Sequence, residues 1–258
     1  MPLLIQKMIF MLIVVITLSA CNQVRSSNQN IRVSQTTSKI ATANLDLGIE
    51  YLKQGAYENA LKNLEKAKKA DPVYAPIYNV FGLLYQQLGD TKKSEENFKR
   101  ALSLNKNDSS TLNNYSNFLC QQNRIEEAEK KFLKAASNPL YDSPEIAITN
   151  AGLCLSKNQR ERDAEKYFRQ ALELNPRVPQ ALIKMCEISY NQKEILTSRA
   201  FLQRYHEVAR HTPRSLWLGI QIEQQLGNKD TVSSYVLQLK NNYPESQEAK
   251  LLDLSRIQ

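Results

Sequence analysis

The stretch NLDLGIEYLKQGAYENALKNLEKAKKADP, residues 44–72, predicts two amphipathic helices joined by a sharp turn at Gln54-Gly55. Apolar and small residues recur every three or four positions on each side of this turn, as on the buried face of a helix. They are Leu47, Gly48 and Tyr51 in the first helix, predicted over 43–54, and Ala60, Leu64 and Ala67 in the second, predicted over 57–70. Pro72 ends the unit, because proline lacks an N–H and clashes with the preceding helical turn.

The same pattern returns along most of the chain. Its most regular mark is a small residue in the first helix, found at Gly48, Gly82, Ser116, Gly152, Cys186 and Gly219. Successive members lie 34, 34, 36, 34 and 33 residues apart. A period near 34, with small, aromatic and proline residues in this order, resembles the tetratricopeptide repeat. The resemblance implies an all-α fold, a right-handed α-solenoid superhelix built from helix pairs.

We expect one tetratricopeptide-repeat domain over residues 40–258, because a helix pair of this kind buries its apolar side only by stacking on its neighbours. Six helix pairs are predicted at about 41–74, 75–108, 109–144, 145–178, 179–211 and 212–245. The last two are degenerate, with Ser198 and Thr231 in place of the usual alanine. Residues 246–258 are predicted as a short helix that caps the open end of the stack.

The N-terminal residues predict export and a lipid anchor. An apolar run of roughly ten residues begins at Met8, which is too short to span a bilayer and suits a signal peptide over 1–20. It ends in Leu18-Ser19-Ala20-Cys21, which resembles a bacterial lipobox and implies cleavage before Cys21 and acylation of that residue, for example with palmitate. The alternative is an ordinary secretory signal followed by a chance cysteine. Residues 21–39, rich in Ser, Asn, Gln and Thr, are predicted to be a flexible tether.

Charge and glycine placement argue against nucleic-acid binding and against an enzyme. The net charge of +8 is modest, and much of the charge lies in i,i+4 pairs such as Glu58–Lys62 that are typical of a solvated helix face. The seven glycines all fit small-contact or turn positions, so none is left for a phosphate-binding loop. His206 and His211, taken to lie on one helix, are about 140° apart around it and cannot chelate one metal ion. We therefore predict no catalytic residue, metal, cofactor, nucleic acid or small-molecule substrate.

Three cysteines follow Cys21, and two of them belong to successive repeats. Cys120 and Cys154 lie 34 residues apart, each near the end of a predicted first helix. First helices of neighbouring repeats pack side by side, and an exported chain meets an oxidising compartment, so we predict a disulfide between these two residues. The alternative is two buried thiols that pack as small apolar residues. Cys186 stands at the close-contact position and is predicted to stay free.

The inner wall of such an array is built from first helices, and its side chains predict a groove for a partner protein. The groove positions are Leu45, Ile49, Leu52, Asn79, Leu83, Gln86, Asn113, Asn117, Gln121 and Thr149, continuing to Leu153. An apolar entry followed by a row of amides suits an extended segment, because amides donate and accept hydrogen bonds at once. Alternatively, these amides simply face water.

Three motifs make the chain similar to the PilF/PilW family, the outer-membrane lipoprotein pilotins of type IV pilus secretins. They are N-N-Y-x-x-F-L-C at 113–120, R-S-L-x-L-G-I at 214–220 and Y-x-L-Q-L-K-x-x-Y-P at 235–244. The resemblance implies a non-enzymatic protein, anchored by its lipid on the periplasmic face of the outer membrane. Such a protein binds secretin subunits and promotes their localisation or multimerisation. Two alternatives stay open: a general scaffold lipoprotein for peptidoglycan or outer-membrane protein assembly, and a hydrolase whose site the sequence does not reveal.

Overall fold

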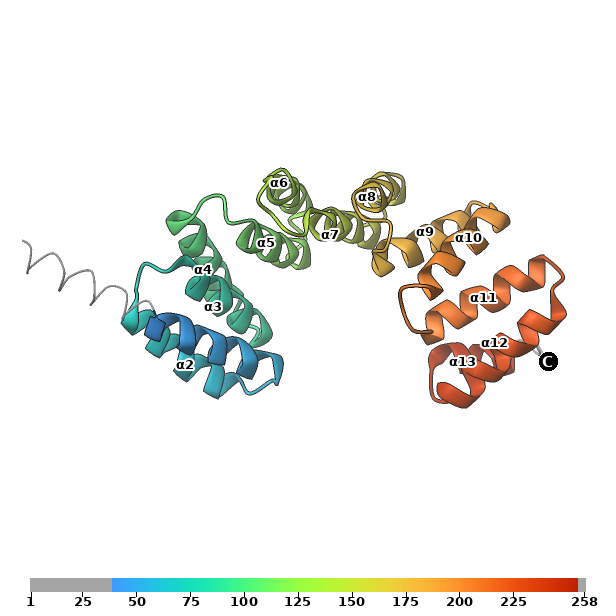
Figure 1. The fold of residues 1–258 in the computed structure, drawn as a ribbon, viewed down its shortest axis with the longest axis horizontal. Coiled ribbons are helices and arrows are strands. Elements are labelled where there is room, and N and C mark those ends of the chain that lie inside the picture. The colour runs from blue at the N-terminus through green and yellow to red at the C-terminus, as the bar shows by residue number, and fades with distance from the viewer. Residues whose placement is uncertain (1–38, 255–258) are drawn as a thin grey trace, which may run out of the picture. The chain divides into compact units, whose positions relative to one another are not determined.

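The computed structural model describes residues 39–254, and every regular element in this range is an α-helix (Figure 1). The all-α prediction is confirmed for this part of the chain. The predicted signal peptide, the lipidation site Cys21 and nearly all of the predicted tether lie outside the described residues, as do residues 255–258. The described residues belong to two compact units, one ending at Lys106 and the other starting at Asn107. None of the helices within residues 39–254 combines the length and apolar character needed to cross a bilayer.

The first unit contains two helix pairs. Residues 39–53 are helical and precede α2 (Tyr57–Ala70), whose bounds match the prediction for the second helix. The next pair is α3 (Ala75–Gln87) and α4 (Thr91–Leu104), which pack against each other. Asp90 caps the N-terminus of α4 by accepting a 3.0 Å hydrogen bond from the backbone N–H of Lys93, which satisfies one of the free donors of the first turn.

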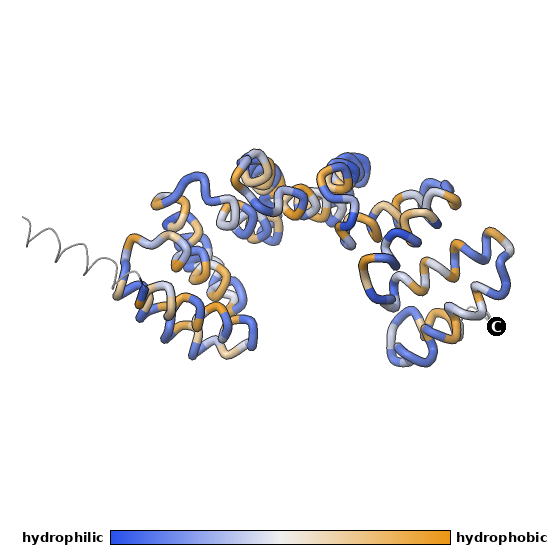
Figure 2. Tube along the Cα trace, in the orientation of Figure 1, coloured by the Kyte–Doolittle hydropathy of each residue, from blue (hydrophilic) through white to orange (hydrophobic). Residues whose placement is uncertain are grey.

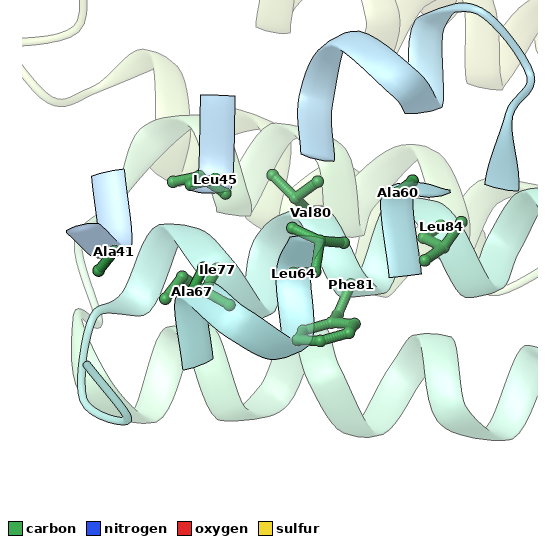
Figure 3. Close-up of a cluster of buried hydrophobic side chains, with 9 residues drawn as sticks. All are labelled: Ala41, Leu45, Ala60, Leu64, Ala67, Ile77, Val80, Phe81 and Leu84. Carbon is green, nitrogen blue, oxygen red and sulfur yellow. The ribbon is translucent and has the colours of Figure 1, made fainter. Parts of the chain in front are cut away.

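The core of the first unit is a cluster of small and large apolar side chains from its first three helices (Figure 3). Its buried members are Ala41, Leu45, Ala60, Leu64, Ala67, Ile77, Val80, Phe81 and Leu84. The cluster joins both helices of the first pair to the first helix of the next pair. Each helix pair therefore completes its core only with its neighbour, as expected for a repeat array.

Leu45 and Leu47 have the reverse of their predicted environments. Leu45, predicted to face the groove, is 4% exposed and lies in the core, whereas Leu47, predicted to pack, is 50% exposed. Two positions along a helix turn it by about 200°, so these two side chains face nearly opposite sides. The residue equivalent to Leu47 in the second pair is Phe81, which packs into the core of the preceding pair. Leu47 belongs to the first pair, and within the described residues no earlier pair lies against it.

The second unit continues the alternation of first and second helices. Its elements are α5 (Ser109–Gln121), α6 (Ile125–Ala136), α7 (Pro144–Lys157), α8 (Glu161–Leu174), α9 (Pro179–Asn191), α10 (Ile195–His206), α11 (Pro213–Gln225), α12 (Lys229–Asn242) and α13 (Gln247–Leu254). Each odd-numbered helix from α5 to α11 packs against the helix that follows it, and α13 packs against α11 and α12. Figure 2 shows hydrophobic residues recurring at intervals along these helices rather than in one continuous run.

Small residues let the two helices of a pair approach closely. In four pairs a glycine of the first helix contacts a bulky side chain 16 residues later: Gly48 with Leu64, Gly82 with Phe98, Gly152 with Phe168 and Gly219 with Tyr235. A Cβ placed on any of these glycines would come within 2.8 Å of that side chain. The recurring small residue in the sequence is therefore a packing requirement.

The turn inside each helix pair needs one residue with a positive φ. Gly55, Gly89 and Gly227 fill this position with φ between 73° and 76°, and the structure places Asn123, Gln159 and Lys193 there in the intervening pairs with φ between 59° and 63°. Left-handed backbone is open to glycine but strained for residues with a Cβ. The turn geometry is kept even where the glycine is absent.

Candidate functional site

A polar pocket lies on the second unit between α5 and α7. Its volume is about 420 Å³. It is lined by Asn117, Cys120, Gln121, Asn123, Asn150, Leu153, Cys154, Lys157 and Asn158. Five of these nine residues carry a side-chain amide, and Lys157 is the one charged residue among them. The pocket therefore offers hydrogen-bond donors and acceptors together with one positive charge.

A disulfide between Cys120 and Cys154 forms part of the pocket wall. The Cα atoms of the two residues are 5.9 Å apart, within the range that a disulfide can bridge. Cys120 belongs to α5 and Cys154 to α7, so the bond links the first helices of two neighbouring pairs. It thereby fixes the distance between the two sides of the pocket.

Cys186 is a free, buried thiol, as predicted. Burial raises the pKa of this thiol to about 11, so it is protonated at neutral pH. The Ser198 hydroxyl lies 3.4 Å from the Cys186 sulfur and donates to the Cys186 carbonyl at 2.9 Å. Cys186 is thus a packing residue of the α9–α10 pair.

Hydrogen bonds hold two amides of the pocket in place. Asn150 Nδ2 donates to Asn113 Oδ1 at 3.0 Å, which links α7 to α5 a second time. Asn158 Nδ2 donates to the Cys154 carbonyl at 2.8 Å. Both bonds use the side-chain amide nitrogen as the donor. The side-chain oxygens of Asn150 and Asn158 are therefore not occupied by these bonds and can still accept hydrogen bonds.

Of the predicted groove positions in the second unit, the structure brings Asn117 and Gln121 together at the pocket, with Leu153 beside them. Asn113 is 9% exposed and is held by Asn150. Thr149 is 1% exposed and its hydroxyl donates to the Glu145 carbonyl at 2.7 Å. Thr149 therefore corrects the prediction, because a side chain buried against its own helix offers no surface to a partner.

The predicted groove positions in the first unit are more apolar and more buried. Leu45 is a core residue, as described above, and Asn79 is 9% exposed. Ile49 and Leu52 are partly buried and pack against the core cluster of that unit. Leu83 and Gln86 are partly buried as well. Four of the six positions predicted there thus retain some accessible surface.

Sequence reasoning missed four residues of the pocket. Asn150 and Lys157 lie on α7, and Asn123 and Asn158 lie just after the ends of α5 and α7. Groove positions are predicted only within the first helices, which leaves out Asn123 and Asn158. In the pair α7–α8 they are Thr149 and Leu153, which leaves out Asn150 and Lys157. The run Gln121-Gln122-Asn123 and the pair Lys157-Asn158, at equivalent places in two repeats, were the available signal.

The two histidines correct a further prediction. Helix α10 ends at His206, and His211 lies in the segment before α11, so they are not on one helix. The chain turns back between them and brings the ring centroids to 4.0 Å. Burial, together with the neighbouring His211, lowers the pKa of His206 to about 4, and burial lowers the pKa of His211. Within residues 39–254 no group of three or more His, Cys, Asp or Glu side chains is placed to hold a metal ion.

The helix pairs, their packing glycines and their turns define a class of protein. The sequence profile of the tetratricopeptide repeat matches residues 41–74, 75–108 and 147–178. These ranges correspond to the helix pair 39–53 with α2, the pair α3 with α4, and the pair α7 with α8. The chain is a tetratricopeptide-repeat protein whose regular elements within residues 39–254 are all α-helices, which confirms the fold expected from the 34-residue period.

Comparison with known proteins narrows the class to one family. The type IV pilus assembly protein PilF of Pseudomonas aeruginosa is 31% identical over 226 residues, which span 87% of this chain and 90% of the relative. The solved structure of P. aeruginosa PilF matches with a TM-score of 0.77 at 30% identity, covering 86% of this chain and all of that one. The crystal structure of PilW, a type IV pilus biogenesis factor, matches with a TM-score of 0.71 at 30% identity, covering 83% and 98%. The chain belongs to the PilF/PilW family of tetratricopeptide-repeat type IV pilus proteins.

Proposed function

We propose that the protein is an outer-membrane lipoprotein that binds secretin subunits and promotes their localisation or multimerisation during type IV pilus biogenesis. The observation that carries this proposal is the relationship to PilF along nearly the whole length of both chains. A match of that extent covers the repeat array and its surfaces, so the similarity is not limited to a single helical repeat. Membership in the family is the reason for naming a secretin as the partner.

The chemistry of the described surface supports binding rather than catalysis. The pocket between α5 and α7 presents amides, one lysine and a disulfide. Amides of this kind pair with the N–H and C=O groups of a partner's backbone. We propose that the protein is not an enzyme and acts by holding and delivering another protein.

The lipid anchor in this proposal rests on the sequence Leu18-Ser19-Ala20-Cys21. Acylation of Cys21 would attach the repeat domain to the periplasmic face of the outer membrane. Each buried CH₂ of an acyl chain contributes about 0.8 kcal/mol, so two or three chains bind a soluble domain firmly. An anchored binding surface then acts where a secretin ring has to assemble.

Deletion of the gene tests the proposed function. Secretin multimers, measured by immunoblot of membrane fractions, and surface pili, counted by electron microscopy, should both be lost and should return with the wild-type gene. Intact multimers and pili, together with altered cell shape or an altered outer-membrane protein profile, would instead support a general envelope scaffold.

The anchor is tested separately by complementing the deletion with Cys21→Ser. We expect this variant to leave the outer-membrane fraction, whereas the matched change Ser27→Ala in the same segment should stay there. Recovery of Cys21→Ser in the outer membrane at the wild-type level would remove the lipid from the mechanism and leave the family relationship untouched.

A further inference from the structure

We propose that the pocket between α5 and α7 binds an extended segment of a partner protein, pairing its backbone with side-chain amides and one acidic side chain with Lys157. The proposal deepens the proposed function, since it rests on the partner being a protein. It places the recognition of the partner at the pocket on the second unit.

Backbone recognition follows from the amides that remain available. Asn117 makes no side-chain hydrogen bond with another residue in the described part of the chain, and it is half-buried at the pocket. The side-chain oxygens of Asn150 and Asn158 are not used by the bonds that orient these residues. An extended peptide presents N–H and C=O groups in alternation, so a surface with both free donors and free acceptors fits it. A helical segment would not fit, because its backbone groups are already paired.

The charge of the pocket selects an acidic side chain. Lys157 is exposed at the C-terminal end of α7 and is the one charged residue among those lining the pocket. Its ammonium group has no carboxylate within ion-pair distance among the residues that the structure describes. A bound carboxylate would therefore gain a partner without displacing one, and a bound lysine or arginine would meet like charge.

The two sides of the pocket are held together before any partner arrives. The disulfide joins Cys120 of α5 to Cys154 of α7, and the Asn150–Asn113 hydrogen bond joins the same two helices elsewhere. Binding to a site whose walls are already fixed loses less conformational entropy, which strengthens association. The volume of about 420 Å³ falls within the range of about 300–1,000 Å³ typical of ligand pockets and suits a few residues of an extended chain.

A peptide selection tests the proposal directly. The full-length protein, purified in mild detergent, would be used to select from a displayed library of random 12-residue peptides fused at their C-terminal ends. We expect the selected peptides to share one Asp or Glu. Synthetic versions with amidated C-termini should still bind, which would place the recognised carboxylate on a side chain rather than at a chain end.

Substitutions in the pocket give the decisive comparison. Lys157→Gln should weaken binding of a selected peptide up to about fivefold, as expected for an exposed ion pair. Lys157→Glu should make the selection favour Lys or Arg at the same peptide position. Asn117→Ala should weaken binding about tenfold through loss of backbone hydrogen bonds. The control variants Lys193→Gln and Asn242→Ala, both exposed and outside the pocket, should bind as the wild type does.

Three results would overturn the proposal: no peptide enriched by the wild type, no change of charge preference with Lys157→Glu, or equal effects of pocket and control variants. Thermal melting of each variant beside the wild type ensures that a loss of binding is not a loss of folding. The selection uses no secretin, so a failure here is separate from a failure of the proposed function, which the deletion strain reports.

Discussion

Gly82 lies directly beneath the ring of Phe98, so close that a Cβ on residue 82 would come within 2.6 Å of Phe98 Cε1. The two residues belong to the two helices of one pair, α3 and α4. The same relationship joins Gly152 to Phe168 in the pair α7–α8. Close packing of a ring on the backbone thus sets how near the two helices of a pair can approach.

Replacing Gly82 with alanine should therefore destabilise the protein. Overpacking of a core typically costs about 1–3 kcal/mol, and the higher helix propensity of alanine offsets about 1 kcal/mol of it. We expect a net loss of up to about 2 kcal/mol in the free energy of unfolding, measured by urea titration. The double variant Gly82→Ala with Phe98→Leu should lose less free energy of unfolding than the sum of the losses of the two single variants. If the two losses simply add, the contact between residues 82 and 98 is not the cause.

Introducing glycine at the turns that lack it should stabilise the protein, in contrast to the loss expected for Gly82→Ala. Gln159 and Lys193 have φ values of 61° and 63°, a conformation that costs a residue with a Cβ about 1 kcal/mol or more. Gln159→Gly or Lys193→Gly should raise the thermal midpoint, whereas Gly89→Ala, at the equivalent turn, should lower it. A gain in stability with Gly89→Ala would contradict the assignment of this turn conformation.

Reduction of the Cys120–Cys154 disulfide should lower stability substantially. The bond closes a loop of 34 residues, and loops of this size typically contribute about 2–4 kcal/mol by restricting the unfolded chain. The double variant Cys120→Ser with Cys154→Ser should melt at the same temperature as the reduced wild type and should not respond to reductant. Equal melting of oxidised and reduced wild type would show that the bridge adds nothing.

Lowering the pH should destabilise the protein through the region where His206 and His211 are in contact. Burial and the neighbouring His211 lower the pKa of His206 to about 4 from its ordinary 6.5, so the unfolded chain binds more protons between these two pH values. The contribution of the neutral ring is complete above pH 6.5 and is lost as the pH falls toward about 4. Urea midpoints at pH 7.5 and pH 5 should therefore differ more for the wild type than for His206→Phe. Identical pH profiles would exclude His206 as a source of the acid sensitivity.

Features that depend only on spacing along the chain could be predicted from the sequence. The positions of Gly48, Gly82 and Gly152 set the helix pairs, and the structure has a pair around each of them. Cys120 and Cys154 lie on the first helices of successive repeats, which pack side by side, and their Cα atoms are 5.9 Å apart. The period of the repeat predicts these features without any knowledge of the loop conformations.

Features that depend on helix rotation or on loop paths were harder to predict. Leu45 and Leu47 are both apolar and two residues apart, and only contact with the neighbouring pair decides which one is buried. The contact between His206 and His211 required knowing that α10 ends at His206. Lys157 is the equivalent of Gln121 only when the 36-residue step between Ser116 and Gly152 is applied. Tertiary contacts, rather than local conformational preferences, determine the burial of Leu45 and Leu47, the contact between the histidines and the set of residues at the pocket.

The bridge between α5 and α7 also determines how this part of the chain yields to mechanical force. Tension applied through residues outside 120–154 bypasses the loop of 34 residues that the bond closes. That loop would otherwise release about 110 Å of extended backbone. Stretching of single molecules should show a contour length shorter by this amount in oxidised protein than in reduced protein. The pull would then act on Asn117, Lys157 and Asn158 of the pocket but not on the lining residues between the two cysteines.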